Sequence, residues 1–254
     1  MLKKAIRQKE ILSRLTVNSA LRVRTLANAL SVTTETIRRD LEEMADQGLL
    51  SRTYGGAVLR QPSEPVLTSR QRIYVDEREA IARAVVPLMK GSRVLMLGSG
   101  ATTAIVAKRI ASEMNDVTVL SHSFAVAIAL AANRTIRIVM APGDYHAGEG
   151  ATFGTQTLRF LQNYTADWAV LGASALSPDG PSDALIEAAD IYAAMLQQSA
   201  RQVIVADHSK FDRIATACYA NWSEIDTLVS DQAPHGLLAR ALKRNAVTVV
   251  TADS

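Results

Sequence analysis

Residues 31–41 are Ser31-Val32-Thr33-Thr34-Glu35-Thr36-Ile37-Arg38-Arg39-Asp40-Leu41, and they have the pattern of a capped amphipathic helix. Ile37, Leu41 and Met44 recur at i, i+4 and i+7, which places them in one apolar stripe. The hydroxyls at the start of the run suit a helix N-cap, and Gly48 suits the C-terminal end. We therefore predict a helix over residues 33–47 that buries the stripe and exposes its other faces.

Two shorter apolar patterns precede this helix and a hairpin pattern follows it. Residues 7–16 and 23–30 each place apolar side chains on one side, so we predict a helix over each range. Two short helices and a turn before a third are typical of a helix-turn-helix, whose later helix enters the major groove of DNA. Gly55-Gly56, in the centre of residues 49–59, predicts a two-stranded hairpin. Residues 1–60 are thus predicted to form a winged helix-turn-helix.

Positive charge is concentrated in this part of the chain. Residues 1–60 contain 11 Lys and Arg against 6 Asp and Glu, whereas residues 61–254 contain 17 against 19, within an overall charge of +3. A basic head on a near-neutral body suits a polyanionic partner such as DNA. The simpler alternative is a solvated basic surface without a partner.

Six side chains of the head are predicted to contact double-stranded DNA. A guanidinium either grips guanine in two places or clamps a phosphate, and hydroxyls bond phosphates or base edges. The predicted DNA-binding residues are Thr33, Thr34, Thr36, Arg38, Arg39 and Arg52. Asp40 is expected to be a structural partner instead. The alternative for the arginines is a solvated surface.

Composition disfavours several classes of protein. Cys218 is the single cysteine, so it forms no internal disulfide, and no cysteine and histidine residues stand at metal-ligand spacing. The basic N-terminus is not followed by a long apolar run, so we expect neither a signal peptide nor a membrane span. We expect a cytoplasmic protein without metal or cofactor.

The rest of the chain is predicted to be a linker followed by an α/β domain. Pro62 and Pro65 interrupt the pattern, so residues 61–75 are predicted to be the linker and 76–254 the second domain. Residues 76–89 have a helical pattern. Short apolar runs separated by helical stretches then favour a mostly parallel sheet covered on both faces. The predicted strands are 93–97, 117–121, 136–141, 168–172, 202–206, 227–230 and 247–251.

The end of the first predicted strand has the pattern of a phosphate-binding turn. Gly98-Ser99-Gly100-Ala101-Thr102-Thr103 passes from a strand into a helix, so that backbone N–H groups and hydroxyls meet at a helix N-terminus. Neither a Walker A loop nor a G-x-G-x-x-G fingerprint is present, so nucleotide binding is not indicated. A plain tight turn is the alternative.

Other strand ends add polar residues that meet at the same edge of such a sheet. Residues 121–123 are Ser-His-Ser and residues 207–211 are Asp-His-Ser-Lys-Phe. Lys210 suits a phosphate, and Asp207 suits sugar hydroxyls; as isolated residues both are more often surface charges. His122 and His208 are explained equally well as ligand contacts or as ordinary loop histidines. Glu187, beside Ala188 and Ala189, is a further candidate for the pocket, but its position favours a solvated helix face.

The head resembles a known family. Thr33–Leu41, followed by Gly48-Leu49 and Tyr54-Gly55-Gly56-Ala57-Val58, closely resembles the N-terminal signature of DeoR-family bacterial transcriptional regulators. The resemblance implies a repressor of carbohydrate catabolism genes that binds operator DNA. We expect a homo-oligomer, a dimer or a tetramer, because a single winged helix makes few base contacts. A phosphorylated sugar or related metabolite would release it.

The second domain is also similar to this family, whose effector domain resembles ribose-phosphate isomerases and glucosamine-phosphate deaminases. The resemblance places phosphate recognition at the turn and at Lys210, with Ser121 and Asp207 near the polyol. The implied effector-binding residues are Ser99, Gly100, Ala101, Thr102, Thr103, Ser121, Asp207 and Lys210. Gly98-Ser99 and Ser121-His122-Ser123 depart from the family's usual acidic residue and Thr-Asn-Ser. These departures leave the identity of the sugar open.

Three hypotheses follow. The first is a DNA-binding regulator that is not an enzyme. The second is a sugar-phosphate isomerase or deaminase that carries a DNA-binding head, with acid and base groups among Asp207, His208, Lys210 and Glu187. The third is a sugar-binding scaffold whose head binds DNA without regulating transcription.

Overall fold

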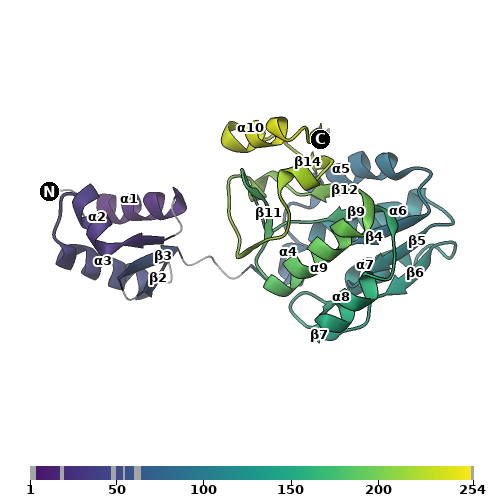
Figure 1. The fold of residues 1–254 in the computed structure, drawn as a ribbon, viewed down its shortest axis with the longest axis horizontal. Helices are drawn as coiled ribbons and strands as arrows, with labels where there is room; N and C mark the ends of the chain where they lie inside the picture. The colour runs from purple at the N-terminus through teal and green to yellow at the C-terminus, as the bar shows by residue number, and fades with distance from the viewer. Residues whose placement is uncertain (1–3, 18–19, 47–49, 54, 60–63, 253–254) are drawn as a thin grey trace. The chain divides into compact units, whose positions relative to one another are not determined.

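The chain folds into two compact units, Met1–Ser63 and Glu64–Ser254 (Figure 1). The computed structural model describes residues 4–17, 20–46, 50–53, 55–59 and 64–252. The division differs from the predicted linker at 61–75, because residues 64–75 belong to the second unit. Helix α4 (Leu67–Arg70) forms there, Leu67 is buried, and its N–H donates to Gly148 O at 2.8 Å.

The first unit contains the predicted helices and hairpin. Its elements are α1 (Lys4–Val17), β1 (Ala20–Arg22), α2 (Val23–Ala29), α3 (Thr34–Asp46), β2 (Leu50–Thr53) and β3 (Gly56–Leu59). The stripe of Ile37, Leu41 and Met44 is fully buried and packs with Ile11 and Leu26. Strand β1, which was not predicted, pairs with β3 and completes a three-stranded antiparallel sheet in the order β1-β3-β2.

All seven predicted strands of the second unit form one parallel sheet. They are β4 (Val94–Leu97), β5 (Thr118–Ser121), β6 (Arg137–Met140), β9 (Ala166–Leu171), β12 (Ser199–Val205), β14 (Thr227–Ser230) and β15 (Thr248–Thr251). The order is β15-β14-β12-β9-β4-β5-β6. The chain therefore builds outward in one direction from β4 and in the other from β9, and the strand order switches between these two strands.

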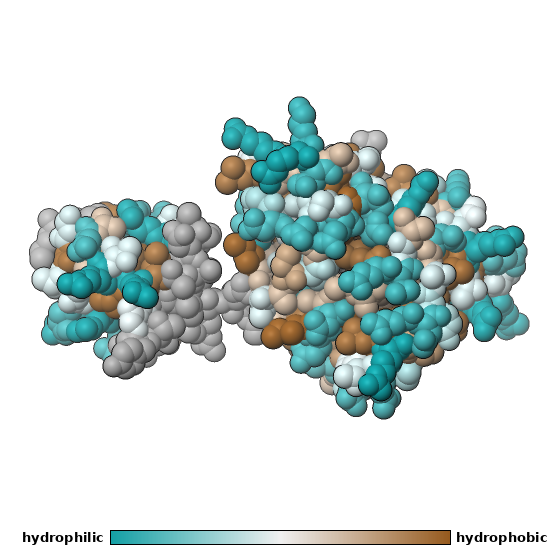
Figure 2. All heavy atoms as spheres, viewed as in Figure 1, coloured by the Kyte–Doolittle hydropathy of each residue, from teal (hydrophilic) through white to brown (hydrophobic). Residues whose placement is uncertain are grey.

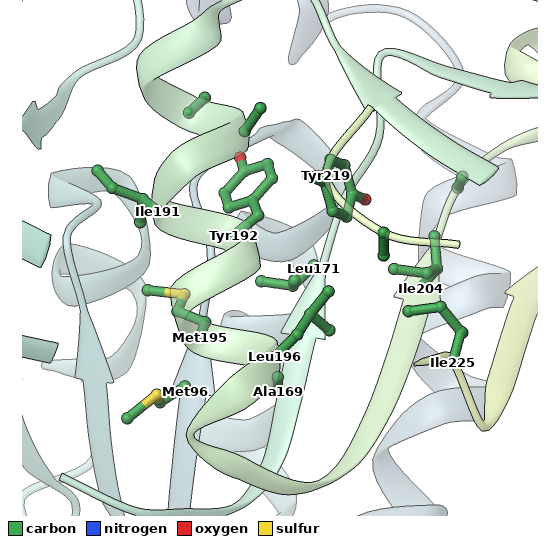
Figure 3. Close-up of a cluster of buried hydrophobic side chains, with 14 of the residues drawn as sticks. Met96, Ala169, Leu171, Ile191, Tyr192, Met195, Leu196, Ile204, Tyr219 and Ile225 are labelled. Carbon is green, nitrogen blue, oxygen red and sulfur yellow. The ribbon is translucent and has the colours of Figure 1, made fainter. Parts of the chain in front are cut away.

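Helices cover both faces of this sheet. Alternate residues of the central strands enter two separate cores, because successive side chains of a strand point to opposite faces. One core packs α8 (Thr155–Leu161), α9 (Ile186–Gln197) and α10 (Gly236–Arg244) against the sheet. Figure 3 shows side chains of α9 packed against Met96, Ala169 and Leu171. The other core packs α5 (Val75–Val85), α6 (Ala101–Glu113) and α7 (Phe124–Leu130).

Some elements differ from prediction or lie outside it. The helix predicted over 76–89 is α5 followed by the 3-10 helix η1 (Val86–Met89), because Pro87 has no N–H to continue the α-helical ladder. Two small antiparallel sheets were not predicted. They are β7 (Asp144–His146) with β8 (Ala151–Phe153), and β10 (Ala175–Ser177) with β11 (Gly180–Asp183) and β13 (Ala217–Cys218). The 3-10 helices η2 (His208–Lys210) and η3 (Trp222–Glu224) complete the unit.

The surface mixes polar and apolar residues on the face shown in Figure 2. In the part of the chain that the structure describes, each helix is too short or too polar to cross a bilayer.

Candidate functional sites

The exposed face of α3 carries the predicted DNA contacts. The side chains of Arg38 and Arg39 are 60% and 80% exposed, while the apolar stripe of the same helix is buried. Glu35 lies 3.8 Å from Arg38 and 3.7 Å from Arg39, distances too long for strong ion pairs at an exposed site. The two guanidinium groups are therefore available to an external anion.

Threonine hydroxyls organise the start of α3. Thr33 Oγ1 accepts a hydrogen bond from the backbone N–H of Thr36 at 3.2 Å and lies 2.9 Å from Thr36 Oγ1. This is the N-cap that the sequence predicts at the head of the helix. Thr33 and Thr34 are exposed and Thr36 is half-buried, so their hydroxyl groups stand at the exposed helix N-terminus.

Asp40 has the structural role that was predicted for it. Its carboxylate accepts two hydrogen bonds from the guanidinium of Arg7, with 3.0 Å between Nη2 and Oδ1. Both side chains are buried, so the pair fixes α1 against α3. The side chain of Arg52, and the residues Gly48 and Tyr54, lie outside the described part of the chain.

A polar cavity lies where the strand order switches in the second unit. Ser99, Gly100, Ala101 and Thr102 line it after β4, residues 172–174 line it after β9, and Lys210 lines it after β12. This is the position where ligands collect in open parallel sheets. The open volume is about 30 Å³, which is small beside the pockets of about 300 Å³ or more that usually hold small-molecule ligands. A sugar phosphate therefore requires side chains to move.

The turn after β4 brings a helix N-terminus to the cavity. Gly100 has φ +137°, a conformation that L side chains rarely adopt, and it caps α6. A Cβ at Gly98 would lie 2.8 Å from Cε1 of Tyr192, so this aromatic ring requires glycine there. The Tyr192 hydroxyl donates to Ser99 O at 2.7 Å and lies 3.0 Å from Ser99 Oγ.

His122 is completely buried and binds the backbone of this turn. Its Nε2 accepts a hydrogen bond from the N–H of Ser99 at 3.1 Å, and its Nδ1 lies 2.8 Å from the carbonyl oxygen of Thr152. These partners fix the neutral tautomer with the proton on Nδ1. Burial lowers the pKa of His122 to about 4, so the ring stays neutral and positions the turn.

Three predicted effector residues, all in the described part of the chain, do not line the cavity. Thr103 donates to Gly100 O at 3.1 Å, and Ser121 donates to Leu97 O at 2.7 Å. Asp207 pairs with Arg78, with 3.1 Å between Oδ2 and Nη2, and both side chains are buried. The polar atoms of these three residues bind other protein atoms, so the residues stabilise the structure around the cavity.

The other five predicted effector residues meet at the cavity together with residues that sequence reasoning missed. Lys210 Nζ lies 3.0 Å from Glu64 Oε1. Arg70 pairs with Glu149 and lies 3.6 Å from Glu64. The lining residues that were missed include Glu64, Arg70, Arg78, Glu149, Asp183 and Tyr192. They come from distant segments without a shared motif. The one available signal was Tyr192, the single aromatic residue in the alanine-rich helix α9.

Asp183 is the carboxyl group with the most perturbed ionisation at this site. Burial, together with the negative charges of Glu64 and Glu149, raises its pKa to about 6 against the opposing effect of the hydrogen bond from the N–H of Leu185. Ser174 Oγ lies 3.3 Å from Asp183 Oδ2. The cavity thus combines three cations, Arg70, Arg78 and Lys210, with three carboxyl groups, Glu64, Glu149 and Asp183.

The remaining candidates are held elsewhere. His208 Nδ1 lies 2.5 Å from Asp231 Oδ2, and the ring packs edge-on against Tyr74. Glu187 is exposed at the start of α9 and is not among the residues that line the cavity, all of which are described.

Comparison with known families identifies both units. Residues 7–63 match the DeoR-like helix-turn-helix domain, and residues 73–232 match the DeoR C terminal sensor domain. Together the two matches span most of the chain.

Relatives match over nearly the full length. A glycerol-3-phosphate regulon repressor of Escherichia coli K12 is 32% identical over 216 residues, which cover 82% of this chain and 83% of the relative. A putative aga operon transcriptional repressor of Escherichia coli O157:H7 is 28% identical, covering 96% and 92%. Among solved structures, ribose 5-phosphate isomerase A of Methanocaldococcus jannaschii matches with a TM-score of 0.40 and 20% identity, covering 54% and 55%.

Proposed function

The chain belongs to the DeoR family of transcriptional regulators, and from this premise we propose that it represses carbohydrate catabolism genes in the cytoplasm and leaves its operator when a phosphorylated sugar or related metabolite binds. Helix α3 contacts operator DNA through Thr33, Thr34, Thr36, Arg38 and Arg39, and Arg52 of β2 contacts the backbone. A homo-oligomer supplies paired half-sites, because a single winged helix makes few base contacts.

The observation that carries the effector proposal is the cavity at the switch point. The N-terminus of α6 favours an anion, and Lys210 and Arg70 add positive charge to the lining of the same cavity. Gly100, Ala101 and Thr102 offer backbone N–H groups to phosphate oxygens, and Ser99 and Thr102 offer hydroxyl groups. The names of the relatives support this ligand class, since one represses a glycerol-3-phosphate regulon.

The alternative of an isomerase or deaminase has less support. Its acid and base candidates are engaged in structural pairs, since Asp207 binds Arg78, Lys210 binds Glu64 and His208 binds Asp231. Turnover of a ketose–aldose phosphate pair by the purified protein would favour this alternative.

Thermal unfolding across a panel of sugar phosphates and their unphosphorylated parents tests the effector proposal. A ligand at about 100 times its Kd adds roughly 2.7 kcal/mol of stability. For a unit of this size we expect the unfolding midpoint to rise by about 5–10 °C. The rise should require the phosphate and be lost in Lys210→Ala, and it should persist in Glu187→Gln as the control. Stabilisation by a free sugar alone would refute the phosphate assignment.

A further inference from the structure

Glu64 lies close to two of the three cationic side chains that line the cavity. Its carboxylate lies 3.0 Å from Lys210 Nζ and 3.6 Å from Arg70 Nη1, and it accepts a hydrogen bond from the Ser174 hydroxyl. The side chain is only 14% exposed. Two cations and a hydroxyl donor around one buried carboxylate are the surroundings that a phosphate group requires.

The ionisation of Glu64 agrees with this geometry. Burial alone would raise the pKa of its carboxyl group, yet the charges of Lys210 and Arg70 and the hydrogen bond from Ser174 hold that pKa below its usual range. Glu64 is therefore an anion at neutral pH, within a cavity whose free volume is about 30 Å³. An entering phosphate therefore meets two cations that are already paired with this carboxylate.

We infer that Glu64 is an internal substitute for the effector's anionic group, which must expel Glu64 from Lys210, Ser174 and Arg70 in order to bind. This rests on the proposed function for the identity of the effector, but the competition itself holds for any anion of phosphate's size. A tethered carboxylate acts at a high effective concentration. The apparent Kd for an external anion equals the intrinsic Kd divided by the fraction of molecules in which Glu64 has left the site, so the carboxylate weakens binding.

The position of Glu64 in the chain gives this competition a consequence. Glu64 is the first residue of the second unit, and only residues 60–63 separate it from strand β3 of the winged helix-turn-helix. The residue after Glu64 is held by the 2.8 Å hydrogen bond from Arg70 Nε to Pro65 O, and Arg70 also binds Glu149. An anion that replaces Glu64 changes the partners of both Arg70 and Lys210. The contacts of Glu64, where the second unit joins the DNA-binding unit, thus change when an anion binds in the cavity.

Titration with inorganic phosphate tests the substitution without knowledge of the effector. Calorimetric titrations of the full-length protein at constant ionic strength compare wild type, Glu64→Ala and Glu64→Gln. We expect both variants to bind phosphate at least tenfold more tightly than wild type, because the tethered competitor is gone. Glu187→Gln, which removes an exposed acid of the same unit, should bind like wild type, and adding Lys210→Ala to Glu64→Ala should abolish the gain.

Two results would overturn the inference. Equal phosphate affinity of wild type and both variants, including no binding by any of them, would show that Glu64 does not compete with the anion. Weaker binding by the variants would show that Glu64 helps to bind it. Glu64→Gln decides if Glu64→Ala does not fold, since it keeps the shape of the side chain and loses only the charge. If the Glu64 variants gain phosphate affinity but wild type binds none of the sugar phosphates, the proposed effector class is rejected and the inference about Glu64 stands. Binding of a sugar phosphate equally to all three proteins would reject the inference alone.

Discussion

Asp183 shows how burial gives one side chain a titration near neutral pH. Its pKa is raised from 3.8 to about 6, mainly by burial and then by neighbouring carboxylates. The folded state therefore holds a proton that the unfolded state releases between about pH 4 and 6. The stabilisation from this protonation is complete below pH 4 and is lost as the pH rises through about 6.

Asp183→Asn should remove this pH dependence. A shift of about two pKa units corresponds to a free energy on the order of 2–3 kcal/mol. Relative to wild type, the variant should thus gain stability of this order between pH 4 and pH 7, because the amide keeps an acceptor for the N–H of Leu185 and carries no charge. Urea unfolding of both proteins at pH 4, 5.5 and 7 measures the difference. A difference that stays constant with pH would contradict the account.

The residues of the cavity also show what a sequence predicts at this scale. Ser99, Gly100 and Thr102 were predicted because glycines and hydroxyls follow one another at the end of an apolar strand. Glu64 and Arg70 were not, because no local pattern distinguishes a buried charge from a surface one. Thr103, Ser121 and Asp207 were placed in the ligand site because sequence shows which side chains follow a strand, but not which protein atoms they bind.

At the scale of elements, a buried ion pair adds to the apolar packing that positions α3 against α1. Asp40 binds Arg7 of α1, and both side chains are buried. Strong periodicity predicted α3 itself, and continuous apolar runs predicted all seven strands of the large sheet. The small strands β7, β10 and β13 have two or three residues each and no apolar alternation. Their existence depends on tertiary contacts that the sequence does not display.

Asp40→Ala should destabilise the first unit selectively. Removing one partner of a buried pair costs roughly 3 kcal/mol or more, because the guanidinium of Arg7 stays buried without this carboxylate. Amide exchange in α1 and α3 should accelerate on the order of 100-fold, while α6 and α9 remain unchanged. Glu35→Ala is the matched control, since its exposed contacts contribute less than about 1 kcal/mol. Equal exchange rates in the two variants would refute the role of the pair.

At the scale of the whole molecule, a ligand in the second unit controls DNA binding only through a difference in affinity between two states of the chain. A tenfold preference for the state that does not bind DNA corresponds to about 1.4 kcal/mol. The coupling is reciprocal, so operator DNA must weaken ligand binding by the same factor. The sequence predicted a helix-turn-helix unit followed by an α/β unit, but neither the charge network of the cavity nor its contact with residue 64.

The most direct measurement is the affinity of the full-length protein for an operator duplex chosen by in vitro selection, with and without the sugar phosphate that stabilises it. Fluorescence anisotropy at fixed salt should show a Kd at least tenfold higher with saturating ligand. Arg38→Ala/Arg39→Ala should lose specific binding in both conditions, whereas Arg240→Ala in the exposed part of α10 should bind like wild type. An unchanged Kd at saturating ligand would contradict the proposal that this chain is a repressor released by a phosphorylated effector.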